Sequence, residues 1–341
     1  MSGSYFFIIL QGFTKTSTEN QLIINITKKM RIESSTVLLK FIFPALALFI
    51  FSQEIQAQQW KRYRKEVHFG LGANYFLGEL GGANQVGTNF VRDLEISTTR
   101  PTLTAGYRYN VSAYSKVRAS LFMGTLKGSD ALTQEPFRNN RNLHFRSRVI
   151  ELDAIYEYYF NQEQSGHRYN IKGAKGMKAK GLTYYAFGGV GLIYFNPKAQ
   201  YNGNWIALQP LGTEGQGLPG GGRKYSRVTV VIPYGLGLRY AINREWKIGL
   251  EVGMRKTFTD YLDDVSGNYY DNKTLLQERG IVAATLADPS KGVFANTQYD
   301  PATGRTRDGI QRGDPKDKDS YGFITVTACY RLKRRGSRAK F

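Results

Sequence analysis

The stretch VTVVIPYGLGLRYAINREWKIGLEVGMR, residues 228–255, decides the fold. Apolar and polar side chains alternate through both of its halves, and this period of two is typical of β-strands whose two faces meet different surroundings. Little more than Asn243, Arg244 and Glu245 separates the halves. The stretch therefore predicts two antiparallel strands joined by a tight turn.

The same alternation recurs along the chain and predicts six further strands. Their approximate ranges are 67–76, 102–109, 117–124, 150–158, 183–195 and 324–331. Long and short connections alternate, so the two kinds of loop gather at opposite ends of the strands. The connection 161–181 is an exception, because it is longer than a turn although it falls at the short-loop end. The pattern predicts an all-β fold with eight antiparallel strands in up-and-down order.

An even number of strands, each about ten residues long, is the pattern of an outer-membrane β-barrel with long extracellular loops. In hydrocarbon every backbone amide and carbonyl must be paired, and a sheet meets that demand only when it closes. A soluble barrel would turn its apolar face inward, and the period alone does not separate the two cases. The polar face carries charges of both signs, which favours a narrow lumen where they pair. The predicted lumen charge network is Arg108, Arg118, Glu151, Asp153, Glu157, Arg239, Glu251 and Arg255.

The beginning of the 341-residue chain has the order of a secretory signal. From Met30, a basic start leads into an apolar run over residues 37–51 and then into a short polar segment. The run is too short for a transmembrane anchor and is interrupted by Lys40. We therefore expect residues 1–57 to be an N-terminal extension and cleaved signal peptide, with Met30 as the true start. Residues 58–341 would form the barrel domain, integral in the cell outer membrane.

Composition narrows the chemistry. A formal net charge of +20 is compatible with binding to nucleic acid, with binding to an anionic membrane surface, or with a basic soluble protein. We expect outer-membrane lipids rather than nucleic acid as partners. The single cysteine, Cys329, excludes an internal disulfide and any multi-cysteine metal site. His68, His144 and His167 are scattered along the chain. We therefore expect a protein that is not an enzyme and that holds no cofactor and no metal.

A basic segment at residues 167–180 falls at the short-loop end, as does the basic C-terminus RLKRRGSRAKF. Together they would form a docking surface for an acidic periplasmic protein or for anionic lipid headgroups. A solvated run of charge is the alternative. The candidate docking residues are Arg168, Lys172, Lys175, Lys178 and Lys180.

Two loop sequences contain residue types that are common in binding sites, but not at the spacing that such sites require. GELGGANQVGTNFVRDLE, residues 78–95, contains neither nucleotide-binding glycine pattern and precedes no helix pattern. FTDYLDDVSGNYYDN, residues 258–272, gathers four aspartates without the alternating order of a calcium loop. We expect both to be loops beyond the strands, with carboxylates that cap turns or pair with arginines.

These two loops carry a family resemblance. The sequences YFLGELGGANQVGTNFVRDLEISTTRPTLTAGYRYN (residues 75–110) and FTDYLDDVSGNYYD (residues 258–271) resemble a Bacteroidetes family of outer-membrane β-barrels that includes PorG of the type IX secretion system. The positions that mark the resemblance are Gly78, Glu79, Gly81, Gly82, Asn84, Arg92, Asp93, Asp260, Asp263 and Asp264. The resemblance implies a non-enzymatic barrel that associates, on its periplasmic side, with a ring formed by a lipoprotein and its partner.

The expected function is that of a structural or accessory component of type IX protein transport. An eight-stranded barrel is filled by its own side chains, so we expect no conduction of solutes, and function would lie in the loops or on the outer surface. Two alternatives stay open. One is an OmpX-like barrel that binds through its long loops, and the other is an outer-membrane lipid-modifying enzyme.

Overall fold

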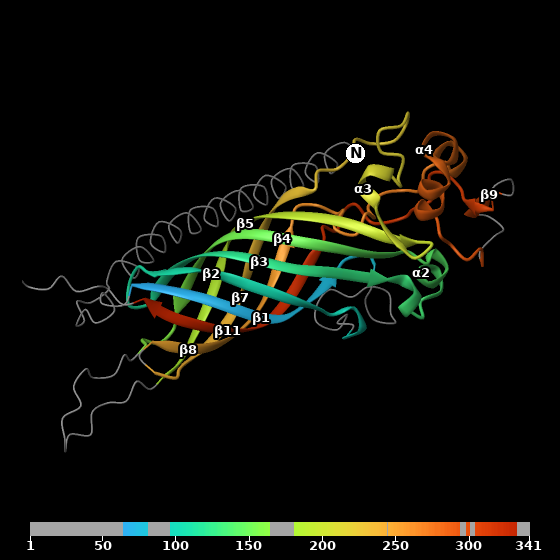
Figure 1. Ribbon diagram of the computed structural model, residues 1–341. Helices are drawn as coiled ribbons and strands as arrows, with labels where there is room; N and C mark the ends of the chain where they lie inside the picture. The colour runs from blue at the N-terminus through green and yellow to red at the C-terminus, as the bar shows by residue number, and fades with distance from the viewer. Residues whose placement is uncertain are drawn as a thin grey trace, which may run out of the picture. The chain divides into compact units, whose positions relative to one another are not determined.

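A computed structural model describes residues 64–80, 96–163, 181–243, 245–293, 298–300 and 304–332 (Figure 1). The chain divides into two compact units, Met1–Gln58 and Gln59–Phe341, and every described residue belongs to the second. The expected signal segment, with its start at Met30, lies outside the described residues.

The second unit is a closed antiparallel β-barrel of eight strands among the residues described. Each strand pairs with the next along the chain, and the first also pairs with the last, so the wall has no open edge. The predicted fold class is confirmed. The barrel strands are β1 (Lys65–Leu77), β2 (Arg100–Asn110), β3 (Ser115–Ser129), β4 (His144–Tyr159), β5 (Leu182–Tyr201), β7 (Val228–Ala241), β8 (Trp246–Thr257) and β11 (Ser320–Leu332).

The two faces of the wall differ as the alternation predicts. Outward-facing apolar side chains are exposed, for example Leu71 at 55%, Leu152 at 63% and Leu236 at 63%. Inward-facing charged side chains are buried, for example Arg108 at 0% and Glu251 at 2% exposed. An apolar outer surface and a charged interior invert the arrangement of a soluble barrel and suit a wall surrounded by hydrocarbon.

Side-chain oxygens fix the short connections at one end of the barrel, which we call the turn end. The Ser112 hydroxyl accepts hydrogen bonds from the amides of Tyr114 and Ser115. The Asn243 side chain accepts from the amides of Glu245 and Trp246, each at 2.8 Å. Such local bonds are the reason that serine and asparagine favour turns. At the opposite end, the loop end, the strands are joined by long connections.

Three strands extend at least five residues beyond their predicted ranges toward the loop end. β3 continues to Ser129, β4 begins at His144, and β5 continues to Tyr201. The period of two persists there, but the outward residues are polar, so the apolar signal fades. A short strand, β6 (Asn204–Ala207), pairs only with the last part of β5.

Tyr75 also differs from expectation. Its place in the alternation is outward, like that of Val67 and Leu71, yet it is only 7% exposed. Its directly opposite residue is Gly322, and a Cβ on that glycine would lie 2.1 Å from the tyrosine ring. The ring therefore lies across Gly322, and its hydroxyl contacts the Met254 sulfur at 3.6 Å.

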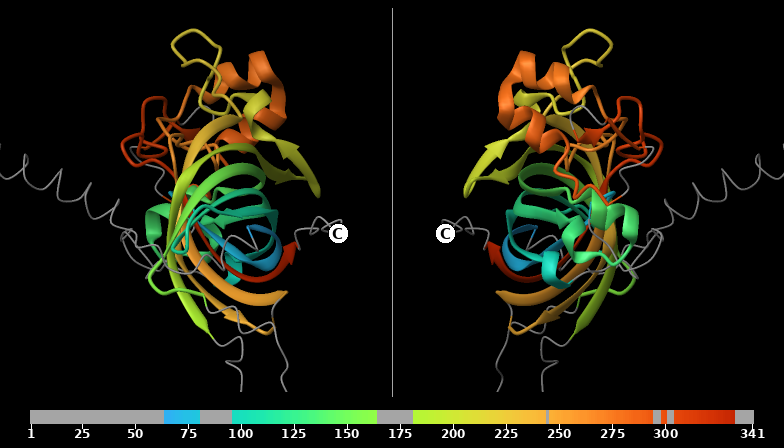
Figure 2. Two further views of the ribbon diagram at one scale, coloured as in Figure 1. Left: turned by 90° about the vertical axis from the view of Figure 1, so that its left-hand side faces the viewer. Right: turned by 90° about the vertical axis from the view of Figure 1, so that its right-hand side faces the viewer.

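The described parts of the long loops pack into a cap beyond the loop end (Figures 1 and 2). The apolar core runs without a break from the lumen, at Phe323 and Phe187, to Leu262 and Val265 in the loop before β11. The cap was not predicted to contain helices. Its elements are the 3-10 turns η3 (Ile96–Thr98) and η4 (Asp130–Leu132), the helices α2 (Pro136–Arg141), α3 (Leu208–Leu211) and α4 (Asn272–Ala287), and the short strands β9 (Tyr299–Asp300) and β10 (Arg305–Thr306).

Candidate functional site

The lumen holds a network of buried ion pairs, and the predicted residues meet there. Arg108 lies 2.9 Å from the Glu157 carboxylate, and Arg239 lies 3.3 Å from it. Arg118 donates to Glu251 at 2.6 Å. Because these residues come from five different strands, the network ties opposite parts of the wall together.

A second group lies nearer the loop end. Arg255 donates to the Glu151 carboxylate at 2.6 Å and lies 3.8 Å from Asp153. Its guanidinium is held between the rings of Phe122, at 3.9 Å, and Phe323, at 4.0 Å. Cations over aromatic faces and beside carboxylates are well satisfied in a dry interior. This arrangement fills the lumen with side chains.

Five further members of the network were not assigned to it from the sequence. Four of them lie on the same face of their strands as the assigned residues, so extending the alternation to the strand ends would have identified them. These four are Glu66, Lys116, Lys247 and Arg331. The fifth, Glu163, comes from the connection after β4. It accepts from Lys247 at 2.8 Å, lies 3.4 Å from Lys116, and pairs with Arg331. No sequence signal shows that a loop residue enters the barrel mouth.

His68 and Cys329 also face the lumen and are buried. A guanidinium nitrogen of Arg108 lies 3.6 Å from the Cys329 sulfur. His144 lies at the loop end of β4, where its Nε2 accepts a hydrogen bond from the Gln200 amide at 2.9 Å. His167 is outside the described residues.

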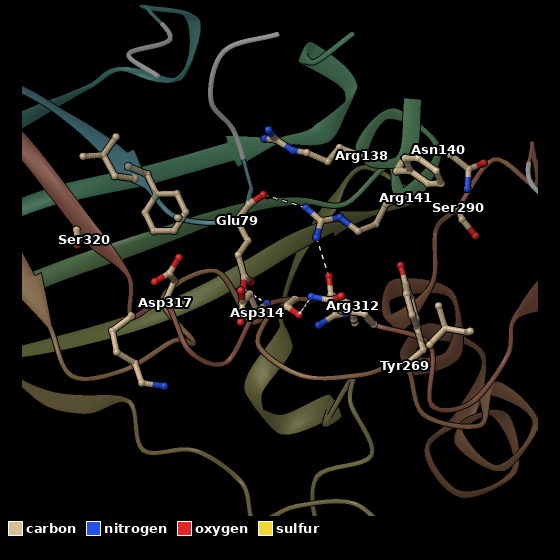
Figure 3. Close-up of a pocket in the computed structure, with 18 of the residues that line it drawn as sticks. Glu79, Arg138, Asn140, Arg141, Tyr269, Ser290, Arg312, Asp314, Asp317 and Ser320 are labelled. Carbon is tan, nitrogen blue, oxygen red and sulfur yellow. Dashed lines mark hydrogen bonds between the residues drawn. The ribbon is translucent and has the colours of Figure 1, made fainter. Parts of the chain in front are cut away.

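In the cap, the two family-motif loops come together. The Glu79 carboxylate, from the first motif, accepts from the backbone amide of Asp314, and the Glu79 carbonyl accepts from Arg141 at 2.9 Å (Figure 3). From the second motif, the Asp264 carbonyl accepts from Arg312 at 2.6 Å. Arg141 donates to the Arg312 carbonyl at 2.7 Å, so the two arginines link the loops. The carboxylates that gather here are Glu79, Asp260, Asp263, Asp264 and Asp319, which we call the cap carboxylates.

The cap carboxylates are crowded and poorly supplied with cations. Burial raises the pKa of Glu79 to about 8, and burial raises the pKa of both Asp260 and Asp264 to about 6. Burial, together with acidic neighbours, raises the pKa of Asp263 and of Asp319 well above the usual range. A buried carboxyl without a full counter-charge keeps its proton to a higher pH.

A pocket with a volume of about 940 Å³ opens in this region. In Figure 3, Glu79, Arg141 and Arg312 lie at its centre, with Ser320 and Asp317 on one side and Tyr269 and Ser290 on the other. Its lining is mixed, because Arg138, Lys256 and Lys318 face the pocket together with Asp314, Asp317 and Phe137. The two central arginines are engaged with protein groups, since Arg141 pairs with Asp130 and Arg312 with Glu214.

Many of the predicted site residues lie outside the described residues. These are the motif positions Gly81, Gly82, Asn84, Arg92 and Asp93, and the docking candidates Arg168, Lys172, Lys175, Lys178 and Lys180. Gly78 is described, and a Cβ at that position would lie 2.3 Å from an Asp319 carboxylate oxygen. The first motif therefore needs glycine where it passes the cap carboxylates.

Within the described ranges, no group of three or more His, Cys, Asp and Glu side chains is arranged to hold a metal ion. No helix in that part of the chain is both long and apolar enough to cross a membrane.

Several solved barrels are similar in fold. Ail, the attachment invasion locus protein of Yersinia pestis, aligns with 80% of this chain and 99% of its own, at 10% identity and a TM-score of 0.34. Neisserial surface protein A aligns with 79% of this chain and 96% of its own, at 7% identity and a TM-score of 0.33. The N-terminal barrel of Pseudomonas aeruginosa OprF aligns with 79% and 99%, at 10% identity and a TM-score of 0.30. These values are too low to carry an argument about function.

No curated protein matches the chain. A family model, by contrast, matches residues 40–279, which is well over half of the sequence. The match spans the barrel from β1 through β8 and includes both motif loops. The chain therefore belongs to the family described as domain of unknown function DUF6089.

Proposed function

We propose that this protein is a non-enzymatic, integral outer-membrane barrel that serves as an accessory component of type IX protein secretion. It would dock the periplasmic ring, formed by a lipoprotein and its partner, through its turn end. The apolar outer wall supports the membrane location, and the filled lumen argues against a role in solute conduction. The resemblance of the motif loops to the PorG-containing family supports the choice of machinery.

One observation carries the choice of the turn end. Glu163, the last described residue before the basic segment, is held inside the barrel mouth by Lys116, Lys247 and Arg331. Gly181, the first described residue after that segment, leads directly into β5. The described residues on either side of the basic segment are therefore fixed to the wall. A docking element with fixed ends loses less conformational entropy on binding than a free tail does.

Crosslinking in intact cells tests this proposal. A photo-reactive residue at Lys172, Lys175 or Lys178 should capture the ring lipoprotein or its partner, and the same residue at Lys273 in α4 should not. Deletion of the gene should abolish export of type IX cargo. Unchanged export, or equal capture from Lys273, would contradict the proposal.

Surface binding is the second candidate, and the cap favours it. The cap is folded and bears the 940 Å³ pocket. Binding through the cap predicts that removal of residues 272–310 abolishes adhesion while export continues. That outcome, with no crosslinks from the turn end, would favour the surface binder.

A further inference from the structure

Three cations stand side by side on the outer surface of the barrel near the loop end. Lys127 of β3 is directly opposite Arg146 of β4, and Arg146 is directly opposite Lys198 of β5. We call these three residues the basic row. All three have the outward parity, because the residues next to them in sequence, such as Leu126, Phe145 and Ala199, are buried.

Like charges placed directly opposite one another on neighbouring strands destabilise a sheet. The basic row contains two such pairs, and Arg148 adds a fourth cation one step closer to the barrel centre. None of the four forms an ion pair with a carboxylate of the described residues. The outward neighbours are Thr125, Asn196 and His144, which bring no negative charge. The sequence therefore maintains a repulsive cluster without an internal counter-charge.

The position of the row indicates what would supply that charge. Two outward positions nearer the barrel centre, beyond Thr125, Arg148 and Asn196, the same three strands present an apolar row. It consists of Met123, Ile150 and Tyr194, which are 39%, 47% and 39% exposed. Arg146 lies four residues nearer the loop end of β4 than Ile150 does, which is about 13 Å at the rise of a strand. Long basic side chains at that height reach the boundary where lipid headgroups begin.

The row is also partly preorganised. The Arg146 guanidinium stacks over the Trp205 ring at 4.1 Å. Trp205 belongs to β6, where it is directly opposite Gln200, two residues beyond Lys198 in β5. His144 meets the edge of the same tryptophan ring. A cation held over an aromatic face keeps its N–H groups available for an anion. In Figure 1 the ends of β3, β4 and β5 lie together at the loop end, which is the external end in barrels of this type.

We propose that the basic row binds the phosphate groups of an anionic lipid in the outer leaflet, whose acyl chains lie against Met123, Ile150 and Tyr194. The phosphates relieve the repulsion between the three cations. This site lies at the opposite end from the proposed periplasmic docking surface and does not depend on it.

A binding measurement with the full-length barrel in uncharged detergent tests the site. The probe is bisphosphorylated lipid A, compared with dephosphorylated lipid A and with the deacylated, still phosphorylated sugar. The variant K127Q/R146Q/K198Q should bind bisphosphorylated lipid A roughly a hundredfold more weakly than the parent. The matched control K65Q/K273Q/K316Q removes the same charge from three exposed lysines outside both the row and the cap pocket, and it should bind as the parent does.

Thermal unfolding in lipid-free detergent separates binding from folding. The row variant should be as stable as the parent or more stable, because the like-charge pairs are gone. Equal losses of binding in the row variant and the control would overturn the proposal, as would equal binding of dephosphorylated lipid A. Binding of the deacylated sugar as tightly as the intact lipid would assign the row to a soluble polyanion and would overturn the lipid as occupant.

Discussion

The lumen and the cap are both buried and both rich in charge, but they balance that charge differently. In the lumen, arginines and lysines interleave with glutamates from facing strands, so each cation has an anion within reach. In the cap, Arg141 and Arg312 serve a larger set of carboxylates, some of which keep protons instead. The stability of the lumen therefore depends on ion pairs, whereas the stability of the cap depends on the protonation of its carboxylates.

The largest effect should come from the lumen. Glu157→Gln removes the anion shared by Arg108, Arg118 and Arg239 and leaves buried cations without a full counter-charge. We expect a loss of about 3–5 kcal/mol in the free energy of unfolding, measured by urea titration of the barrel in detergent micelles. The matched change Glu278→Gln, at an exposed position of α4, should cost less than about 0.5 kcal/mol. Equal effects would show that the lumen pairs do not hold the wall.

Next in size is the loss of a cap arginine. Arg312→Met leaves Glu214 and Asp264 without their cation, and we expect the cap to lose about 3 kcal/mol of local stability while the strands are unaffected. Hydrogen exchange should increase in residues 260–270 and stay unchanged in β2 and β3. Faster exchange in those strands would mean that the cap and the barrel unfold together, which would contradict the proposed difference between the lumen and the cap.

Raising the pH should loosen the cap. Carboxyls with raised pKa values bind more protons in the folded cap than in the open one, so their stabilisation is complete below about pH 4 and is lost as the pH rises through about 6 to 8. Asp264 alone accounts for on the order of 2–3 kcal/mol. Trypsin should cleave the cap faster at pH 9 than at pH 5, relative to an unstructured reference peptide. Asp264→Asn should flatten that dependence, and a cap most resistant at high pH would contradict it.

The smallest effect concerns a single helix. The Asp271 side chain accepts from the Thr274 amide at 2.8 Å and caps α4. Asp271→Ala should cost about 1 kcal/mol and raise hydrogen exchange only in the first turns of that helix. Asp271→Asn is the control, because it keeps a capping oxygen. Loss of exchange protection across the whole cap would show that the cap is one cooperative unit.

The sequence predicted the barrel better than the cap for a physical reason. A membrane wall repeats one rule at every second residue, so alternation at Val230 and Ile232 or at Leu250 and Val252 was enough to define a strand. The cap obeys no repeated rule. Glu79 and Asp264 lie in the same cap only because two loops that are far apart in the sequence fold over the same end of the barrel. The spacing of residues within either loop does not encode this approach.

The loop-end part of strands β3, β4 and β5 was less predictable than the rest of the barrel but more predictable than the cap. Lys127, Arg146 and Lys198 keep the period of two, but their outward side chains are charged, so an apolar pattern does not register them. Glu163 was missed for a different reason, since no period applies to a connection that bends into the lumen. α4 was missed because its sequence carries little apolar periodicity and its backbone departs from helical geometry at Gly280, although Asp271 is a recognisable N-cap.

The pairing of β1 with β11 has a consequence for how the molecule is made. Among the described strands, β11 is the one that closes β1 against β8, so a chain truncated before Ser320 would have two unpaired edges however well its other strands pair. Such a chain would expose unpaired amides and carbonyls to hydrocarbon, so we expect it not to insert stably into a bilayer.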